Sequence, residues 1–193
     1  MDLLELIARA DERALATSGI ACLDRCLPPP GSGDDPEPLR ALRTGCGSGT
    51  DWAGRLDAVY AALEGAAERD ATTARVRMLL GAAPRDFGAV PLRTWADACS
   101  LLALDIHREF DVPAGGGVRT SGDCRAGGPP DRGPLVMGEL RRQIHILESL
   151  AEPGDTAGGG AGLRRALDLS AEGRRVLRAV MSRHARGRAA PTA

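Results

Sequence analysis

The chain has 193 residues, of which 43% are hydrophobic, 26% are charged and 3% are aromatic. This length and hydrophobic fraction suit a folded domain with its own core rather than a chain that is disordered throughout. The formal net charge of −1 gives the whole chain no general attraction to nucleic acid or to a membrane surface. All 25 basic residues are arginine, since the sequence contains no lysine, and it contains no asparagine either. These absences exclude a Walker A phosphate loop, a Schiff-base lysine and N-glycosylation.

The composition favours helices over sheets. Sheets usually draw on isoleucine, threonine and aromatic residues, whereas this chain is rich in alanine and leucine, which are good helix formers. The abundance of arginine, alanine, glycine and proline is typical of a GC-rich, bacterial genome, and it says nothing about function.

The first helix is predicted from its start signal. Asp2 and Glu5 have the spacing of a capping box, and Ser18-Gly19 is expected to end the helix. The hydrophobic residues in between recur at helical spacing: Leu3, Ile7, Ala10 and Ala14. A short helical turn over 20–27 is expected next, before a loop over 28–38 that is rich in proline and glycine.

Two further helices are predicted over 51–69 and 71–80. In the first, spacings of four and three residues place one hydrophobic stripe along the helix: Trp52, Leu56, Val59, Leu63 and Ala66. The prolines of 84–91 are expected to break the helical pattern after the second.

The clearest predicted helix begins at Thr94, as its N-cap, and ends near Asp111. Its hydrophobic surface is wide, so we expect it to be central. A Gly/Pro-rich stretch over 113–134 follows and is expected to be a flexible loop. Another helix is predicted over 135–151.

The sequence therefore predicts an all-α fold, an irregular bundle of five or six helices joined by Gly/Pro-rich loops. We expect a helical core over 1–152, a Gly-rich linker over 153–162, and a basic helix and tail over 163–193 that dock on the core.

His107 and Asp111 are the weak catalytic candidates. On one helix, residues four apart can meet, and a carboxylate beside an imidazole is half of a general-base arrangement. No nucleophile or second acid completes it in the sequence. A solvated helix edge with ordinary charge pairing is therefore favoured.

The five cysteines are an odd number, which fits reduced thiols better than a disulfide framework. Cys22, Cys26 and Cys46 lack the paired Cys-x2-Cys spacing that is diagnostic of zinc sites. We expect buried cysteines that act as small hydrophobic residues, no metal and no cofactor, although the sequence leaves open whether these three converge.

Arginines crowd the C-terminal region, where only Asp168 and Glu172 oppose them. This basic helix could bind an acidic partner or nucleic-acid phosphates, or dock on the acidic remainder of the chain itself. The partner- or anion-binding candidates are Arg164, Arg165, Arg174, Arg175, Arg178, Arg183, Arg186 and Arg188.

The absence of a complete catalytic set favours a non-catalytic helical interaction or regulatory protein whose partner is another protein. Two alternatives stay open. One is a small-molecule-binding or catalytic domain of specialised metabolism, with a pocket near Trp95, His107 and Asp111, and the other is a nucleic-acid-binding accessory protein. Homo-oligomerisation stays open too. The acidic N-terminal residues are unlike a secretory signal, and no apolar run approaches the roughly 18 residues of a membrane span. We therefore expect a cytoplasmic protein.

Overall fold

The structure, a computed structural model, describes residues 1–28, 37–111, 133–152 and 160–189, with the backbone alone at 160, 185 and 187–189. The expected all-α class is confirmed, because every regular element in these ranges is a helix. The described helices are α1 (Leu3–Arg9), α2 (Glu12–Cys26), α3 (Arg40–Gly45), α4 (Trp52–Ala62), α5 (Glu64–Ala67), α6 (Ala71–Gly81), α7 (Ala89–Phe110), α9 (Pro134–Ala151) and α10 (Gly160–Ala189). The described helices outnumber the five or six that were expected. Short helices, and breaks between helices, leave no clear periodic pattern of hydrophobic residues in the sequence and are therefore hard to predict. Most of the expected loop over 113–134 and of the expected linker over 153–162 lies outside the described residues.

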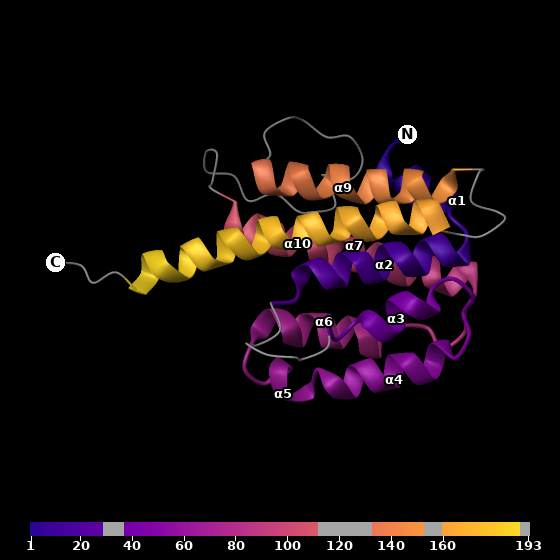
Figure 1. Cartoon of the computed structure of the whole chain (residues 1–193), viewed down its shortest axis with the longest axis horizontal. Coiled ribbons are helices and arrows are strands. Elements are labelled where there is room, and N and C mark those ends of the chain that lie inside the picture. The colour runs from indigo at the N-terminus through magenta and orange to yellow at the C-terminus, as the bar shows by residue number, and fades with distance from the viewer. Residues whose placement is uncertain (29–36, 112–132, 153–159, 190–193) are drawn as a thin grey trace.

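Four long helices form the main body of the molecule. Helix α7 packs along α2, and α10 packs against both α9 and α2 (Figure 1). The short helix α1 lies against α9, while α3 to α6 form a smaller group beside the other flank of α2. Within the described residues, no helix combines the length and hydrophobicity needed to cross a bilayer.

The N-terminal region contains two helices, but the break between them lies at Ala10 and not at Ser18-Gly19, where it was expected. Asp2 and Glu5 form the capping box of α1 as predicted. The chain leaves helical geometry at Ala10, and Asp11 then caps α2 by accepting a hydrogen bond from the amide of Ala14. The stop expected at Ser18-Gly19 is wrong, since α2 runs through it to Cys26.

Gly19 has a packing role inside α2. A Cβ atom at this position would lie 2.7 Å from the Trp95 ring, so only glycine lets α7 bring that ring against α2. Trp95 also makes an edge-on contact with Trp52 of α4, with ring centroids 5.9 Å apart. These contacts join the two helix groups through one hydrophobic core.

Helix α7 begins five residues before the expected cap. Gly88 is its N-cap and Pro91 lies in its first turn, where the missing amide proton of proline costs no helical hydrogen bond. The central position expected for this helix is observed, because Cys99, Ala103 and Leu104 are fully buried in it.

Candidate functional site

Helix α10 presents one side to the body of the molecule. The residues on that side are buried and follow each other at spacings of three and four: Ala166, Ser170, Gly173, Leu177 and Val180. The Ser170 hydroxyl donates to the carbonyl oxygen of Ala21 at 3.4 Å. The basic helix therefore lies against α2 and α9 along much of its length.

Arg174 forms ion pairs with carboxylates of the same chain. Its guanidinium pairs with Asp24 at 3.1 Å and with Glu37 at 2.6 Å. Arg43 pairs with the same two carboxylates, so four charges alternate in one cluster. Burial opposes ionisation of Glu37, but the two arginines outweigh it and lower the pKa of that carboxyl. This cluster joins α10 to α2 and to the chain that leads into α3.

Other α10 arginines also have partners nearby. Arg178 donates to the carbonyl oxygen of Pro28 at 3.4 Å, and burial followed by repulsion from Arg174 lowers its pKa. Arg165 forms an exposed ion pair with Glu152 at 3.2 Å, and Arg186 donates to the Ser182 hydroxyl.

The opposite side of α10 is exposed. From Asp168 onward its exposed residues are Asp168, Glu172, Arg175, Val176, Ala179, Ser182, Arg183 and Arg186, which we call the outer face of α10. Arg164 and Arg165 are exposed one turn before this face, and His184 is exposed beside Phe110. Arg175 and Arg183, like Arg164 near the start of the helix, form no ion pair with another described residue. Arg188 belongs to α10, but its side chain lies outside the description.

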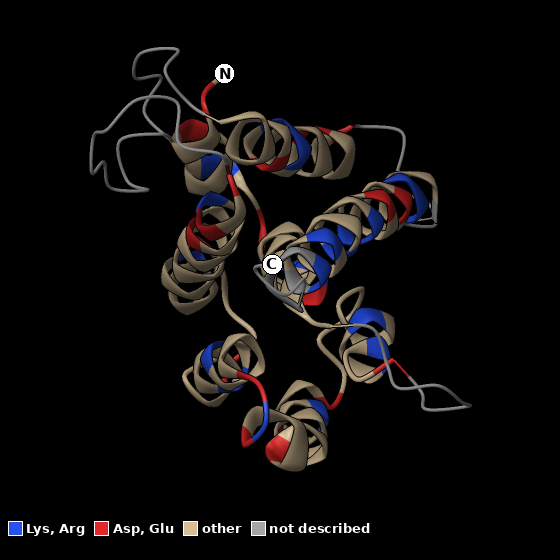
Figure 2. Ribbon diagram, turned by 90° about the vertical axis from the view of Figure 1, so that its left-hand side faces the viewer, with Lys and Arg blue, Asp and Glu red and all other residues tan. Residues whose placement is uncertain are grey.

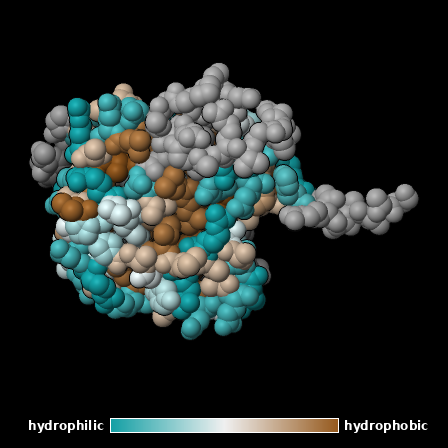
Figure 3. All heavy atoms as spheres, turned by 180° about the vertical axis from the view of Figure 1, so that it is seen from behind, coloured by the Kyte–Doolittle hydropathy of each residue, from teal (hydrophilic) through white to brown (hydrophobic). Residues whose placement is uncertain are grey.

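The outer face stands at the edge of the molecule. The C-terminal end of α10 extends beyond the other helices (Figure 1), and basic residues follow α10 along its length (Figure 2). The opposite side of the molecule differs, because hydrophobic residues gather across its middle (Figure 3). A charged helix face and a hydrophobic face therefore point in opposite directions.

A second polar cluster is fully buried between α2 and α9. Arg25 donates to both oxygens of Glu139, through Nη2 at 2.5 Å and through Nε at 3.0 Å, and both side chains are 0% exposed. Gln143 donates to Glu139 at 2.9 Å and accepts from the Ser100 hydroxyl at 2.6 Å. The cluster therefore links α2, α7 and α9 by polar contacts inside the core.

The two charges of this cluster hold each other ionised. Burial alone would raise the pKa of Glu139, but the attraction of Arg25 outweighs it and brings that pKa to about 2. Burial likewise disfavours the Arg25 cation, yet the charge of Glu139 raises the Arg25 pKa above its ordinary value. The pair is therefore a salt bridge whose partners depend on each other.

Gly173 allows α10 to cover this salt bridge. A Cβ atom at Gly173 would lie 2.6 Å from Cδ of Arg25 and 2.6 Å from Nε of Arg142. Since both arginines lie within the cluster, any larger residue at 173 would push α10 away from it.

The solvated helix edge favoured for His107 is wrong, and the weaker candidate, a contact with Asp111, does not form either. His107 is buried, and its Nδ1 donates to the carbonyl oxygen of Ala103 at 2.7 Å. Its Nε2 lies 3.5 Å from Glu139 and has no hydrogen-bond partner among the described residues. Burial lowers the pKa of His107, an effect that Glu139 only partly offsets.

Asp111 has a structural contact instead. It is the C-cap residue of α7, where an extended ψ angle turns the following chain out of the helix. Its two carboxylate oxygens accept hydrogen bonds from the amides of Leu135 and Val136, each at 2.9 Å. Asp111 therefore caps the start of α9 across 24 residues of sequence.

Cys26, Cys46 and Cys99 are buried free thiols, Cys22 is buried as well, and Cys124 lies outside the described residues. Burial raises the pKa of Cys46 to about 12 and the pKa of Cys26 and Cys99 well above the ordinary thiol value. These thiols are poor nucleophiles at neutral pH. Among the described residues, no three histidine, cysteine or acidic side chains are grouped as a metal site would require.

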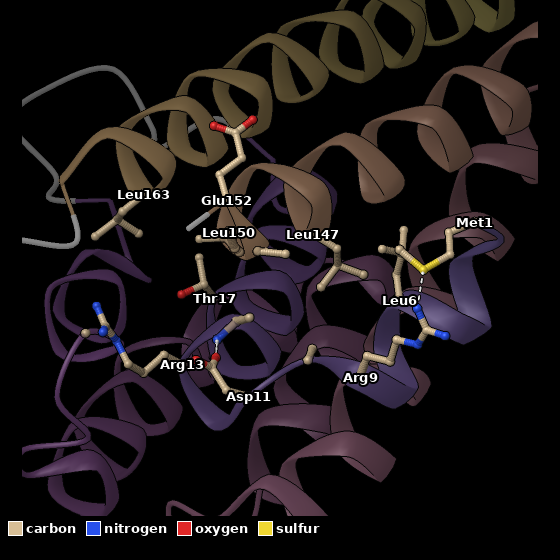
Figure 4. A pocket seen from close by; sticks show the side chains of 14 residues that line it. Met1, Leu6, Arg9, Asp11, Arg13, Thr17, Leu147, Leu150, Glu152 and Leu163 are labelled. Carbon is tan, nitrogen blue, oxygen red and sulfur yellow. Dashed lines mark hydrogen bonds between the residues drawn. The ribbon is translucent and has the colours of Figure 1, made fainter. Parts of the chain in front are cut away.

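Two cavities lie on the surface, away from Trp95, His107 and Asp111. One, of about 410 Å³, lies between α1, the start of α2, the end of α9 and the start of α10 (Figure 4). Leu6, Leu147 and Leu163 line it, with Arg9 and Arg13 among its polar residues. The other is a groove of about 1020 Å³. It lies between helices α3 to α6 and the C-terminal end of α2.

The buried cluster was missed in the sequence. Arg25 and Glu139 could have drawn attention because each lies within a hydrophobic stretch of its helix. Their pairing spans 114 residues, however, and no sequence spacing encodes such a contact.

Comparisons of the chain with protein-family models, with curated proteins and with solved structures found no match.

Proposed function

We propose that this chain is a non-catalytic interaction or regulatory protein of the cytoplasm. Its binding element is the outer face of α10, and its partner is another protein chain that presents a helix bearing carboxylates. The exposed arginines of the outer face are the observation that carries this proposal, since Arg175 and Arg183 form no ion pair with a described residue.

The chemistry of the outer face suits a helix as its partner. Val176 is 41% exposed, and the small residue Ala179 follows it on the same side, so a second helix can approach closely there. The guanidinium groups of Arg175 and Arg183 flank this centre and can each form paired hydrogen bonds with a carboxylate.

A nucleic acid suits this face less well. Arg174 and Arg178 are turned toward the body, which leaves few arginines for phosphates. The chain as a whole carries a net charge of −1, so its remainder would repel a long polyanion. Nucleic-acid binding usually depends on many phosphate contacts.

Photo-crosslinking from the centre of the outer face tests the proposal. A photo-reactive residue replaces Ala179 in one variant and the exposed Met78 of α6 in a control variant. We expect a crosslinked protein from position 179 but not from position 78, with the yield lost when Arg175, Arg183 and Arg186 are all changed to glutamate. Each crosslinked species is identified by mass spectrometry and its binding is repeated with the purified partner.

Two results would contradict the proposal. One is equal crosslinking from positions 78 and 179, and the other is a yield that does not respond to the charge reversal. Crosslinks that disappear after nuclease treatment would assign the face to nucleic acid instead.

The groove beside α3 favours a second candidate function, the binding of a small hydrophobic molecule. Its volume of about 1020 Å³ is in the upper range of ligand pockets, and Leu27, Val59 and Leu63 line it. Ala62 is an exposed lining residue, so Ala62→Trp should fill the groove and abolish thermal stabilisation by any bound compound, whereas His107→Ala should leave that stabilisation intact. The reverse pattern would exclude the groove.

A further inference from the structure

From Asp168 onward, the charged residues of the outer face of α10 are first acidic and then basic, and two exposed arginines, Arg164 and Arg165, precede them. Asp168 and Glu172 lie in the N-terminal part of this face, and Arg183 and Arg186 lie in its C-terminal part. Acidic residues end at Glu172, since the sequence from 173 to 193 contains none. The face therefore carries both a group that attracts arginine and a group that attracts a carboxylate.

The spacing along this face is that of a helix–helix seam. Glu172, Val176, Ala179, Arg183 and Arg186 follow each other at intervals of four, three, four and three residues. Such intervals keep side chains on one stripe that a second helix can cover over several turns. From Glu172 to Arg186 the stripe is about 21 Å long at 1.5 Å per residue.

We propose that the partner of this face is a second copy of the same chain, with the two α10 helices packed antiparallel. This inference rests on the proposed function and names its partner. In this register Val176 lies opposite the second copy's Ala179, and Glu172 lies opposite the second copy's Arg183. Two-fold symmetry repeats each contact, so the dimer has two such ion pairs around a small hydrophobic centre.

The charges select the antiparallel direction. In a parallel pair, each residue would lie opposite its own equivalent, so Glu172 would face Glu172 and Arg183 would face Arg183. Like charges across an interface are unfavourable, whereas the antiparallel direction replaces both contacts by ion pairs. The residues of this stripe are exposed on the side of α10 away from buried Leu177 and Val180, so the second copy's helix can run along them.

Charge exchange at two positions provides the test. Sedimentation velocity over a wide range of protein concentration should show a monomer–dimer equilibrium for the natural chain. Glu172→Arg and Arg183→Glu should each raise the dimer dissociation constant about tenfold or more, because each creates like-charge contacts in place of both ion pairs. The double variant exchanges the two charges and should restore the dimer.

Mixing the two single variants makes the test specific. One variant then has arginine at both positions and the other has glutamate at both, so an equimolar mixture should form a heterodimer while each variant alone stays monomeric. Arg164→Glu makes the same charge change at an exposed position of α10 outside the overlap, and should leave the dimer unchanged. Circular dichroism checks that every variant keeps its helix content.

The outcomes separate this inference from the proposed function. A natural chain that is monomeric at every concentration overturns the dimer, and so does a dimer that ignores both charge reversals. If the chain is monomeric but position 179 crosslinks to a different protein, the proposed function stands and only the identity of the partner is wrong. If neither dimer nor crosslink forms, both are overturned.

Discussion

Two regions of the molecule place arginine in opposite environments: the buried interior between α2 and α9, and the solvent-exposed outer face of α10. Arg25 is fully buried and holds both oxygens of Glu139, while Arg183 is exposed and forms no ion pair with a described residue. The buried cation depends on its partner for stability, because an unpaired charge in a low-dielectric core is costly. The exposed cation is solvated by water and stays free for another molecule. The count of arginines in the sequence therefore predicts neither stability nor binding.

Glu139→Gln should have the largest effect, because it leaves the buried Arg25 cation without a counter-charge. We expect the free energy of unfolding to fall by about 3–5 kcal/mol. Denaturant unfolding measures this loss. Arg164→Ala, at an exposed arginine outside the proposed dimer contact, is the matched surface change and should stay within about 0.5 kcal/mol of the natural chain. Equal losses in the two variants would remove the distinction between buried and exposed charges.

Gly173→Ala should have the next largest effect. The added methyl group would meet Arg25 and Arg142, so we expect a loss of about 1–3 kcal/mol in the free energy of unfolding. Gly138 in α9 is the matched control, since a Cβ atom there has no neighbour within 4 Å. Gly138→Ala should raise stability by up to about 1 kcal/mol through helix propensity. A neutral Gly173→Ala would mean that α10 does not press on the salt bridge.

Asp111→Ala should destabilise the protein by about 1 kcal/mol, because it removes the cap from the first amides of α9. Asp86→Ala, at an exposed position, removes a carboxylate of the same kind and should change stability little. Thermal unfolding of both variants provides the comparison. A similar melting temperature for the two would contradict the capping role.

The smallest expected effect concerns pH. Burial lowers the pKa of His107 below its ordinary value of 6.5, so the folded protein takes up that proton less readily than the unfolded chain. The contribution of neutral, buried His107 to the free energy of unfolding is therefore fully present above pH 6.5. It is lost as the pH falls through the lowered pKa that His107 has in the folded protein. His107→Leu should flatten the fall in stability on the acid side of pH 6.5, as measured by denaturant unfolding at a series of pH values. A slope in this variant equal to that of the natural chain would contradict the pKa direction.

Much of the helical architecture could be predicted from the sequence. The spacing of hydrophobic residues predicted helices over 71–80 and 135–151, and their ends agree with those of α6 and α9 within one residue. The agreement is close because each of these helices has a single buried stripe. The predicted helix boundaries were wrong where tertiary contacts override the local sequence signals. Ser18-Gly19 resembles a helix stop, yet the Trp95 ring occupies the space that Gly19 leaves, and α2 continues.

The polar sites were less predictable. His107 and Asp111 are four residues apart, a spacing that allows contact on a helix. Each side chain has another partner instead, the carbonyl of Ala103 for His107 and the amide of Leu135 for Asp111. The arginines of α10 were visible as a group, whereas the inward turn of Arg174 depends on Asp24 and Glu37, both far away in sequence. Long-range partners of this kind are set by packing and not by local pattern.

The cap that Asp111 places on α9 has a practical consequence for protein engineering. It holds the end of α7 beside the start of α9, so the two ends of the intervening segment are fixed close together. The entropic cost of a longer loop grows slowly, by about 0.6 kcal/mol for each doubling of length. A reporter domain could therefore be inserted within 112–132, or the segment shortened to a brief spacer, while α7 and α9 keep their register.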